Sequence, residues 1–478
     1  MPGILACWEL DRRWREASPL VTRERWITLL VVSAATAMLL LDVTVVNVAL
    51  PAIRDDLDAS FAEMQWVIDA YALTLAATLL SAGALADRIG RRAVFAWGLV
   101  LFTACSALCA AATSPLFLDL ARAAQGVGAA AMFASSLALL ANEFQDAERG
   151  FALGVWGGVT GAALAIGPLV GGVLTDELDW RWIFLVNLPL GGLLIWLTLR
   201  SLPESREEQP RPLDLAGMVT FGAACFLATY GLIRGNEDGW GSLPIAGSLA
   251  GAAALLAAFV AVERRAEAPM LPLSLFRIPA FSGTAVVAFA QSVALYPLLL
   301  FVAIYFQAGL GLSPTETGLR ILPLTLVLVV VAPISGRLTN RLRLRVPLTA
   351  GLVLIGIGLL LMRAVDADSE WTALLPGLLV GGLAIGVISP ALAAAMVSVL
   401  PVERSGLASG INNTFRQLGI AIGIAGLGAI FEHQASEGLG LRAGIVAGLD
   451  SVLAVAAAVA FIGAALAWPL LGDRRSSA

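Results

Sequence analysis

The chain has 478 residues, of which 59% are hydrophobic and only 14% are charged, and its formal net charge is −5. Its mean hydropathy is +0.86. Soluble domains carry about one quarter charged residues, so this composition excludes an ordinary soluble protein and indicates a membrane protein.

Apolar windows of roughly 20 residues, the length that crosses a bilayer as a helix, recur from end to end. Because these runs are continuous and not alternating, they do not fit the strands of a β-barrel. The expected fold class is an all-α integral membrane protein with 14 transmembrane helices. Their expected ranges are 27–50, 65–84, 93–112, 115–140, 151–174, 182–200, 214–233, 243–262, 281–306, 316–336, 347–364, 372–397, 407–430 and 446–470.

Arginine gives the orientation, because the sequence contains no lysine. Residues 1–26 lack the apolar core of a signal peptide and are expected to form a cytoplasmic tail. With this tail inside, inner segments hold 22 of the 30 arginines and outer segments hold six. Such an excess is typical of cytoplasmic loops, so both termini, including a short tail over 471–478, are predicted to be cytoplasmic.

In chain order, the first span carries a buried acid. Asp42 lies in "LLLDVTVVNVALP" (39–51), about 12 Å from the outer end of its helix, and Arg122 of the fourth span lies about 10 Å from its own outer end. Ionisable groups at such depth usually face a cavity or a partner. Burial and a nearby arginine act on a carboxyl pKa in opposite directions, so this pair is suited to proton exchange. The alternative is a static contact that only orders the helices.

A second acid, Asp69, lies in "QWVIDAYAL" of the second span. It is expected about 6 Å from the outer end of that span. Two interpretations stay open: a part in proton or cation uptake, and a solvated residue at the mouth.

The loop "GALADRIGRR" (83–92) follows the second span. Gly83 and Gly90 permit tight turns, Asp87 can accept hydrogen bonds from a helix N-terminus, and Arg88 and Arg91 can bridge to acids. The alternative is a plain positive-inside loop.

Two loops recur at a constant offset, which indicates an internal duplication. "GALADRIGRR" returns as "GRLTNRLRLR" (336–345), with Asn340 in place of the aspartate, and "ERGFALG" (148–154) returns as "ERSGLASG" (403–410). Spans 1–6 then match spans 9–14, as in transporters built from parallel repeats. The expected domains are a six-helix bundle over 27–200, a cytoplasmic linker over 201–213, two inserted helices over 214–262 and a second six-helix bundle over 281–470.

The fifth span, "GVTGAALAIGPLVGG", is rich in small residues. Gly161, Gly167, Gly171 and Gly172 favour close helix packing, and Pro168 is expected to bend the helix. Ordinary tight packing is the simplest explanation.

Arg416, in "NNTFRQLG" of the thirteenth span, has no evident acidic partner, and either lines a cavity or bonds backbone carbonyls. The chain has one histidine, His433, and no GxSxG, HExxH or Walker sequence. We therefore expect neither an enzyme nor an ATP-driven pump, and no cofactor or metal.

Five stretches together carry a resemblance: "LDVTVVNVALP", "GALADRIGRR", "LARAAQGVGAA" (120–130), "AIGPLVGG" (165–172) and "WRWIFLVNLPLG" (180–191). The chain resembles the fourteen-span drug:proton antiporters of the major facilitator superfamily, the EmrB/QacA-like branch, over nearly its whole length. The resemblance implies two six-helix bundles with two inserted helices, and proton-driven export of lipophilic or cationic compounds across the bacterial plasma membrane.

The same resemblance assigns roles to residues. It ties Asp42 and Arg122 to proton coupling, makes the 83–92 loop a cytoplasmic latch, and makes the Gly-Pro element around Pro168 a mark of exporters. The expected partners are a lipophilic small molecule, protons and membrane lipids, with no nucleic acid, and the expected state is a monomer. An exporter of one endogenous metabolite and an uptake permease stay as alternatives.

Overall fold

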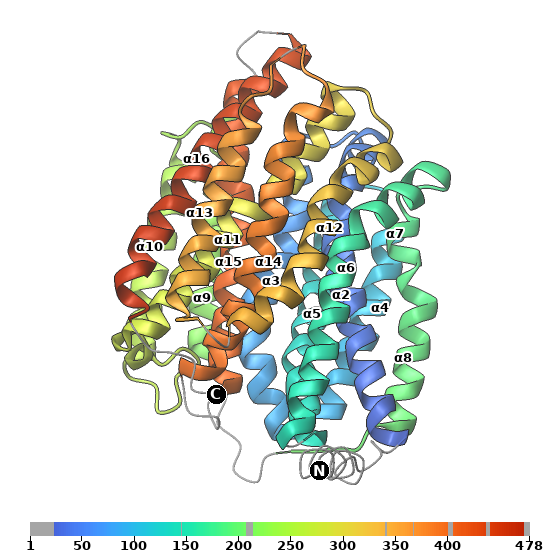
Figure 1. Ribbon diagram of the computed structural model, residues 1–478, viewed down its shortest axis with the longest axis vertical. Coiled ribbons are helices and arrows are strands. Elements are labelled where there is room, and N and C mark those ends of the chain that lie inside the picture. Colours follow the sequence, from blue (N-terminus) through green and yellow to red (C-terminus); the bar gives the residue numbers. More distant parts are fainter. Residues whose placement is uncertain are drawn as a thin grey trace, which may run out of the picture.

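The structure is a computed structural model that describes residues 23–144, 146–206, 214–339, 342–366, 368–399, 405–435 and 440–472. In this part of the chain it consists of long helices with short connections (Figure 1). The elements are α2 (Arg23–Leu57), α3 (Phe61–Ile89), α4 (Arg91–Ala110), α5 (Pro115–Glu143), α6 (Asp146–Glu177), α7 (Trp182–Leu185), α8 (Asn187–Ser201), α9 (Leu215–Asp238), α10 (Leu243–Glu263), η1 (Leu273–Arg277), α11 (Pro279–Ile304), η2 (Tyr305–Gly309), α12 (Pro314–Thr339), α13 (Arg345–Met362), η3 (Trp371–Leu374), α14 (Leu375–Val399), α15 (Ser405–Ala435) and α16 (Leu441–Leu470).

The expected all-α membrane fold is confirmed. Among the described residues, 13 helices are long and apolar enough to cross a membrane, and a bent pair within α6 brings the total to 14. The two parts of that pair, Val155–Ala163 and Ile166–Glu177, meet at an angle of 40°. The bend lies just before Pro168, which cannot donate a backbone hydrogen bond to the preceding turn. The expected span over 182–200 is α7 and α8 together, with Val186 between them.

The helix packing repeats between the two halves of the chain. In the first half α2 packs on α6, α3 on α5, and α4 on α5 and α8; in the second half α11 packs on α15, α12 on α14, and α13 on α14 and α16. The halves meet through two matching pairs, α6 with α12 and α15 with α3. This is the packing expected of two parallel repeats related by an axis along the membrane normal.

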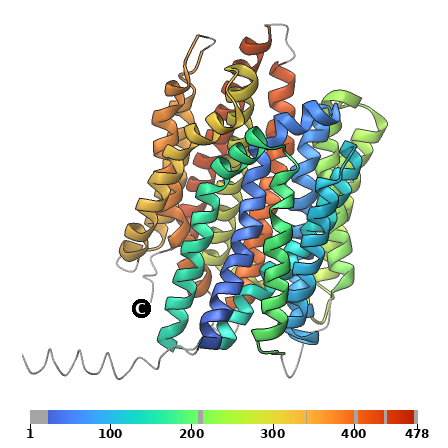
Figure 2. The ribbon, with the colours of Figure 1, turned by 90° about the vertical axis from the view of Figure 1, so that its right-hand side faces the viewer.

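Several contacts between the halves lie towards one of the two ends of the helix bundle. The tail side is the side where α2 begins and α3 ends, and the far side is where α2 ends and α3 begins (Figure 2). Towards the far side, Gln65 donates to the Ile424 carbonyl and Gln307 donates to the Val48 carbonyl, both at 2.8 Å. Phe61 stacks on Phe431 with ring centroids 5.7 Å apart. These contacts hold the halves together on the far side.

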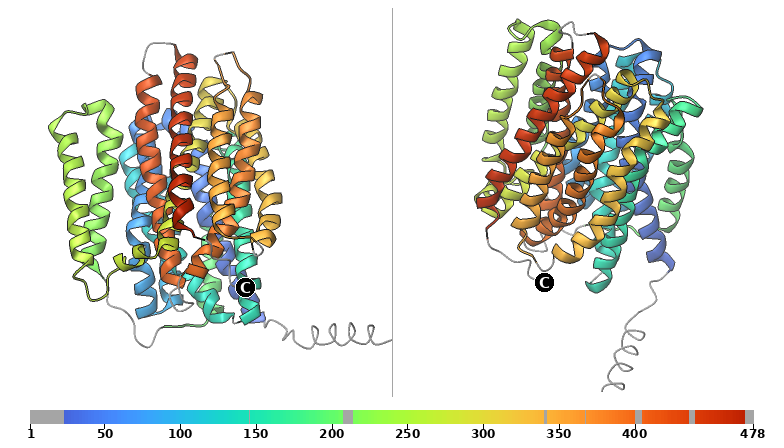
Figure 3. Two further views of the ribbon diagram at one scale, coloured as in Figure 1. Left: turned by 60° about the vertical axis from the view of Figure 1, so that its left-hand side comes forward. Right: turned by 45° about the horizontal axis from the view of Figure 1, so that its top comes forward.

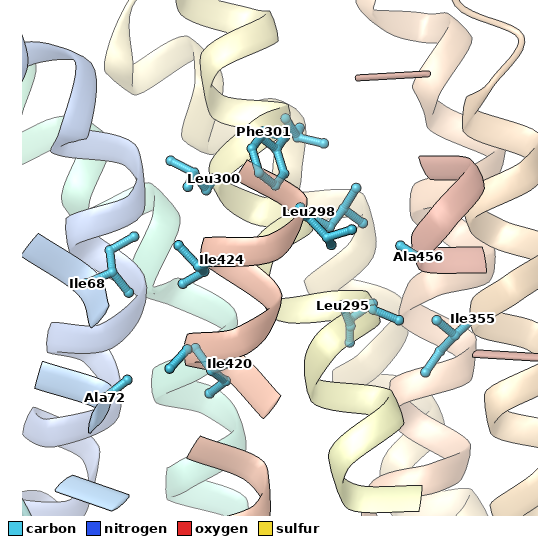
Figure 4. Close-up of a cluster of buried hydrophobic side chains, with 14 of the residues drawn as sticks. Ile68, Ala72, Leu295, Leu298, Leu300, Phe301, Ile355, Ile420, Ile424 and Ala456 are labelled. Carbon is cyan, nitrogen blue, oxygen red and sulfur yellow. The ribbon is translucent and has the colours of Figure 1, made fainter. Parts of the chain in front are cut away.

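A continuous apolar cluster fills the space between α3 of the first half and the helices of the second half. Figure 4 shows Ile68 and Ala72 facing Ile424 and Ile420, with Leu298 and Phe301 on the side away from Ile68. These side chains are buried, and because lipid tails are as apolar as they are, close van der Waals contact is what favours their packing.

Helices α9 and α10 form a hairpin at the edge of the molecule (Figure 3). The α9 helix packs on α3 and α15, one helix from each half, whereas the main packing of α10 is against α9. The hairpin therefore borders the junction between the halves.

Several sequence expectations fall outside the described residues. These are most of the tail over 1–26, linker residues 207–213, the end of the tail over 471–478, and the second-half counterparts Asn340 and Arg341. The exact domain boundaries stay a prediction.

Candidate functional site

Asp42 and Arg122 form an ion pair inside the first half. Arg122 Nη1 donates to Asp42 Oδ2 at 2.5 Å, and both side chains are 1% exposed. The residues come from the middle of α2 and the first half of α5. Two charges buried this completely are stable only when their remaining hydrogen-bonding groups are also satisfied.

Three uncharged side chains provide that satisfaction. Gln125 donates to Asp42 Oδ1 at 3.2 Å and accepts from Arg122 at 2.7 Å. Asn187, from α8, donates to the same Asp42 oxygen at 3.2 Å. Ser106, from α4, accepts from both Gln125 and Asn187. Asp42 therefore accepts three hydrogen bonds in a network that joins α2, α4, α5 and α8.

Arg122 is also fixed to α3. Its Nε donates to the Val67 carbonyl at 3.0 Å, and its guanidinium lies 4.3 Å from the centroid of the Tyr71 ring. Val67 and Tyr71 are one turn apart on the same face of α3. The hydrogen-bonded network around the ion pair thus joins five helices of the first half, α2, α3, α4, α5 and α8.

Gln125, Asn187 and Ser106 were not predicted from the sequence. Each is a polar residue inside an apolar run, which is an unspecific signal. The spacing could have predicted Gln125, because it lies three residues after Arg122 in "RAAQG" and so shares its helix face.

Asp69 differs from Asp42, because neither of its carboxyl oxygens accepts a hydrogen bond from a described residue. Its exposure is 0%. The expectation of a solvated residue at the mouth is therefore wrong for this conformation: α3 begins at Phe61, which places Asp69 about 12 Å along the helix. Asp69 lies one turn beyond Gln65, on the face of α3 that meets α15.

The Gly-Pro element of α6 makes two kinds of close approach. Gly167 lies against Thr44, and Gly171 lies against Val45, where an added Cβ would be 2.8 Å from the carbonyl oxygen. Gly172 instead lies against the Pro314 carbonyl at the start of α12, in the other half. Gly161 has open space where its Cβ would be, so the expected close packing at Gly161 is wrong.

The 83–92 loop is tighter than expected. Gly83 lies inside α3, so it makes no turn, and the turn is at Gly90 alone, with φ 125°. Asp87 accepts from Arg91 Nη2 at 2.9 Å within the loop and does not cap a helix. Arg88 is exposed and pairs with no acid of the described residues.

Glu204, a residue that the sequence analysis passed over, takes the capping role. Its two carboxylate oxygens accept from the backbone nitrogens of Arg92 and Ala93 at 3.0 and 3.1 Å. A Cβ on Gly90 would be 2.6 Å from this carboxylate. The start of the linker between the halves is thus attached to the loop.

Arg416 is half-buried in α15. Its Nη2 donates to the Tyr296 hydroxyl of α11 at 2.6 Å, and its Nη1 contacts Asn413 at 3.4 Å. No carboxylate of the described residues pairs with it. Its bonds are to side chains and not to the backbone carbonyls that one interpretation expected.

Comparison with known proteins agrees with the helical membrane fold described above. The sequence profile of the Major Facilitator Superfamily matches residues 32–424 and 281–478. The chain belongs to this superfamily.

Individual relatives extend the comparison. The multidrug resistance protein Stp of Mycobacterium tuberculosis is 38% identical over 412 residues, covering 86% of this chain and 76% of Stp. The puromycin resistance protein pur8 of Streptomyces alboniger is 38% identical, covering 95% and 93% of the two chains. The multidrug efflux pump LfrA of Mycolicibacterium smegmatis is 32% identical, covering 97% and 93%.

Solved structures agree on the fold. A bacterial homologue of the human lysosomal transporter Spinster, inward-facing and occupied, matches with a TM-score of 0.67 and 18% identity, covering 96% of this chain and all of that one. The peptide transporter POT in complex with sulfate matches with a TM-score of 0.67 and 16% identity, covering 94% and 96%. At this identity the likeness concerns the fold alone.

Proposed function

We propose that this protein exports lipophilic drug-like or antibiotic compounds across the bacterial plasma membrane in exchange for protons, by alternating access. Membership of the superfamily and relatives named for drug resistance and efflux support this proposal. In this proposal the chain is a transporter and not an enzyme, and it works as a monomer. The tail side and both termini lie in the cytoplasm.

The observation that carries the proton-coupling part is the contrast between two buried acids. Asp42 has an arginine and two amide donors, so its ionised form is compensated. Asp69 has no donor among the described residues, so the form compatible with its burial is the neutral one. The two buried acids thus differ in their surroundings: donors compensate a charge on Asp42, and no described donor compensates a charge on Asp69.

A change of conformation alters both environments. Asp69 lies on the face of α3 that packs against α15, so parting of the halves on the far side opens that face to water. In the far-side-open conformation Asp69 takes up a proton from the outside. It carries this proton into the far-side-closed conformation, from which the proton passes to the cytoplasm. Asp42 and Arg122 couple this proton transfer to movement of the helices that their hydrogen bonds join. We assign the proton-coupling role to Asp42, Arg122 and Asp69.

The other candidate residues govern the balance of states. With the halves joined on the far side, Asp87 bonds Arg91 of its own loop. We propose that Gly83, Asp87, Arg88, Gly90 and Arg91 form the cytoplasmic latch. In this scheme Gly167 and Gly171 hold α6 against α2, and Pro168 and Gly172 form the far-side contact with α12. Gly161 and Arg416 face the substrate path.

The experiment is proton release from proteoliposomes upon addition of substrate, comparing wild type with Asp42→Asn. Asparagine keeps one oxygen acceptor for Gln125 and Asn187 but removes the negative charge that pairs with Arg122 and couples proton transfer to the helices. We expect substrate-driven proton release to disappear while substrate still binds. Asp56→Asn, an exposed acid of the same helix that pairs with Arg181, is the matched control and should release protons normally. Proton release at the wild-type level in Asp42→Asn would refute the coupling role.

A further inference from the structure

A second pair of acidic side chains lies outside both six-helix halves. Asp214 is the N-cap of α9, and Glu263 is the last residue of α10, so the two meet where the hairpin closes. Glu263 is 4% exposed. None of the ionisable residues discussed above belongs to this site.

Three of the four carboxyl oxygens of this pair accept a hydrogen bond from a backbone nitrogen. Asp214 Oδ1 accepts from Gly217 N at 2.7 Å, Asp214 Oδ2 accepts from Met270 N at 3.4 Å, and Glu263 Oε2 accepts from Leu271 N at 3.2 Å. The fourth oxygen, Glu263 Oε1, is buried and has no partner among the described residues.

The unpartnered oxygen faces the other carboxyl. An added Cβ on Gly217 would be 2.5 Å from Asp214 Oδ2 and 2.9 Å from Glu263 Oε1, so both oxygens converge on one point. Two acceptors facing each other inside a protein repel unless a proton or a cation lies between them.

We propose that Asp214 and Glu263 form a proton-binding site, in which one proton on Glu263 Oε1 is donated to Asp214 Oδ2. An O–H···O⁻ bond of this kind is short and strong. It completes the set, because each of the four oxygens then has a partner. A metal ion fits less well, since three of the oxygens already accept backbone N–H groups and a cation needs those lone pairs.

Other charges near this end of the hairpin do not replace the proton. Arg264, Arg265 and Glu267, which follow α10, are exposed. On the helices that pack against α9, the charges of this half of the membrane are Asp87 and Arg88 in α3 and Arg416 in α15. None of these groups forms an ion pair or a hydrogen bond with Asp214 or Glu263. Arg211 lies outside the described residues, and the experiment below therefore includes it.

The site connects the hairpin to the second half. Met270 and Leu271 belong to the connector that runs from α10 to η1 and α11, and their backbone nitrogens bond the two carboxyls. Loss of the shared proton leaves two carboxylates in contact, and the connector then separates from the hairpin. The shared proton thus holds the connector in place and makes this attachment sensitive to cytoplasmic pH. The inference stands apart from any substrate or transport step.

Infrared spectroscopy of the reconstituted full-length protein tests the proton directly. Besides the band of protonated Asp69, we expect wild type to show at neutral pH a second C=O component of a protonated carboxylic acid. This component should disappear in Glu263→Gln and persist in Glu267→Gln, the exposed control. A carboxylic-acid band that is the same in Glu263→Gln as in wild type would overturn the proposal. A protonated band that is absent in wild type and arises in Arg211→Gln would also overturn it, because Arg211 would then be the partner.

Hydrogen exchange at Met270 and Leu271 tests the attachment. After correction for the intrinsic pH dependence, these amides should exchange roughly tenfold faster once the shared proton is lost at alkaline pH, about 1.4 kcal/mol of local opening. Glu263→Gln should remove this change, since its amide donates to Asp214 at every pH. Equal pH dependence in wild type and Glu263→Gln would contradict the proposal, and protection that requires added sodium or calcium would show a metal site instead.

Discussion

At the scale of single residues, the first half contains a fully bonded ion pair, and removal of one partner differs from removal of both. Arg122→Gln leaves the Asp42 carboxylate buried without its cation, which costs about 3–5 kcal/mol for buried pairs. We expect the double variant Asp42→Asn with Arg122→Gln to recover most of that stability. Thermal unfolding in detergent measures both.

The contrast with transport makes this prediction specific. The double variant should be stable but should release no protons, because the charge pair that couples proton transfer to the helices is gone. A double variant that is less stable than Arg122→Gln would show that the two side chains do not act as a charge pair.

Asp69 predicts the opposite response to the same kind of substitution. Because its carboxyl has no donor, Asp69→Asn replaces a neutral acid with a neutral amide, and we expect stability to change by less than about 0.5 kcal/mol. Proton release per exported substrate should fall. A large loss of stability, measured against Asp42→Asn under the same conditions, would mean that Asp69 is charged and has a partner.

What the sequence could reveal at this scale depends on the kind of signal. A charge in an apolar run is conspicuous, so Asp42, Arg122, Asp69 and Arg416 were found. An uncharged amide such as Asn187 gives no comparable signal, and its role depends on Asp42, which lies 145 residues earlier in the chain. Such partners follow from packing and not from composition.

At the scale of elements, hydropathy located the spans but not the helix ends. The expected span 65–84 is helical over Phe61–Ile89, because a helix continues beyond the apolar window when its ends are capped. Ser60 and Glu63 form a capping box at one end. The turn at Gly90 was expected from glycine, whereas its anchor Glu204 was not, because the contact spans 112 residues.

Gly90→Ala tests this turn. A residue with φ 125° strains any side chain, which costs about 1–3 kcal/mol, and the added Cβ would also displace the Glu204 carboxylate from the N-terminus of α4. Gly239→Ala is the matched control, since Gly239 has φ 86° with open space around its Cβ. Both variants should lose stability in thermal unfolding, but only Gly90→Ala should reduce transport. Equal transport by the two would show that the loop has no part in the transport cycle.

At the scale of the whole molecule, the repeated packing creates two matching junctions between the halves. The α6–α12 junction contains the Gly-Pro element, and the α3–α15 junction contains Gln65 and borders Asp69. The duplicated loops predicted two equivalent halves. They could not predict that α9 would contact one helix of each half, because the hairpin has no counterpart in the repeat.

Gly172→Ala tests how the α6–α12 junction sets the balance of conformations. Its Cβ would press on the Pro314 carbonyl and lie 2.9 Å from Thr315 Cα, both in the opposite half. Overpacking of this kind costs about 1–3 kcal/mol, and only in the conformation where the halves touch on the far side. The far-side-open population should therefore rise roughly 5- to 150-fold, the ratio that corresponds to this free energy.

Distances between spin labels at the far-side ends of α6 and α12 measure that population in lipid. Gly161→Ala is the control within the same helix, because open space surrounds the position of its Cβ, and its distance distribution should equal that of wild type. Longer distances in Gly172→Ala, together with slower export, would identify the Gly-Pro element as the contact that closes the far side. An unchanged distribution in Gly172→Ala would mean that this junction does not separate during transport, and that the α3–α15 junction alone sets the balance.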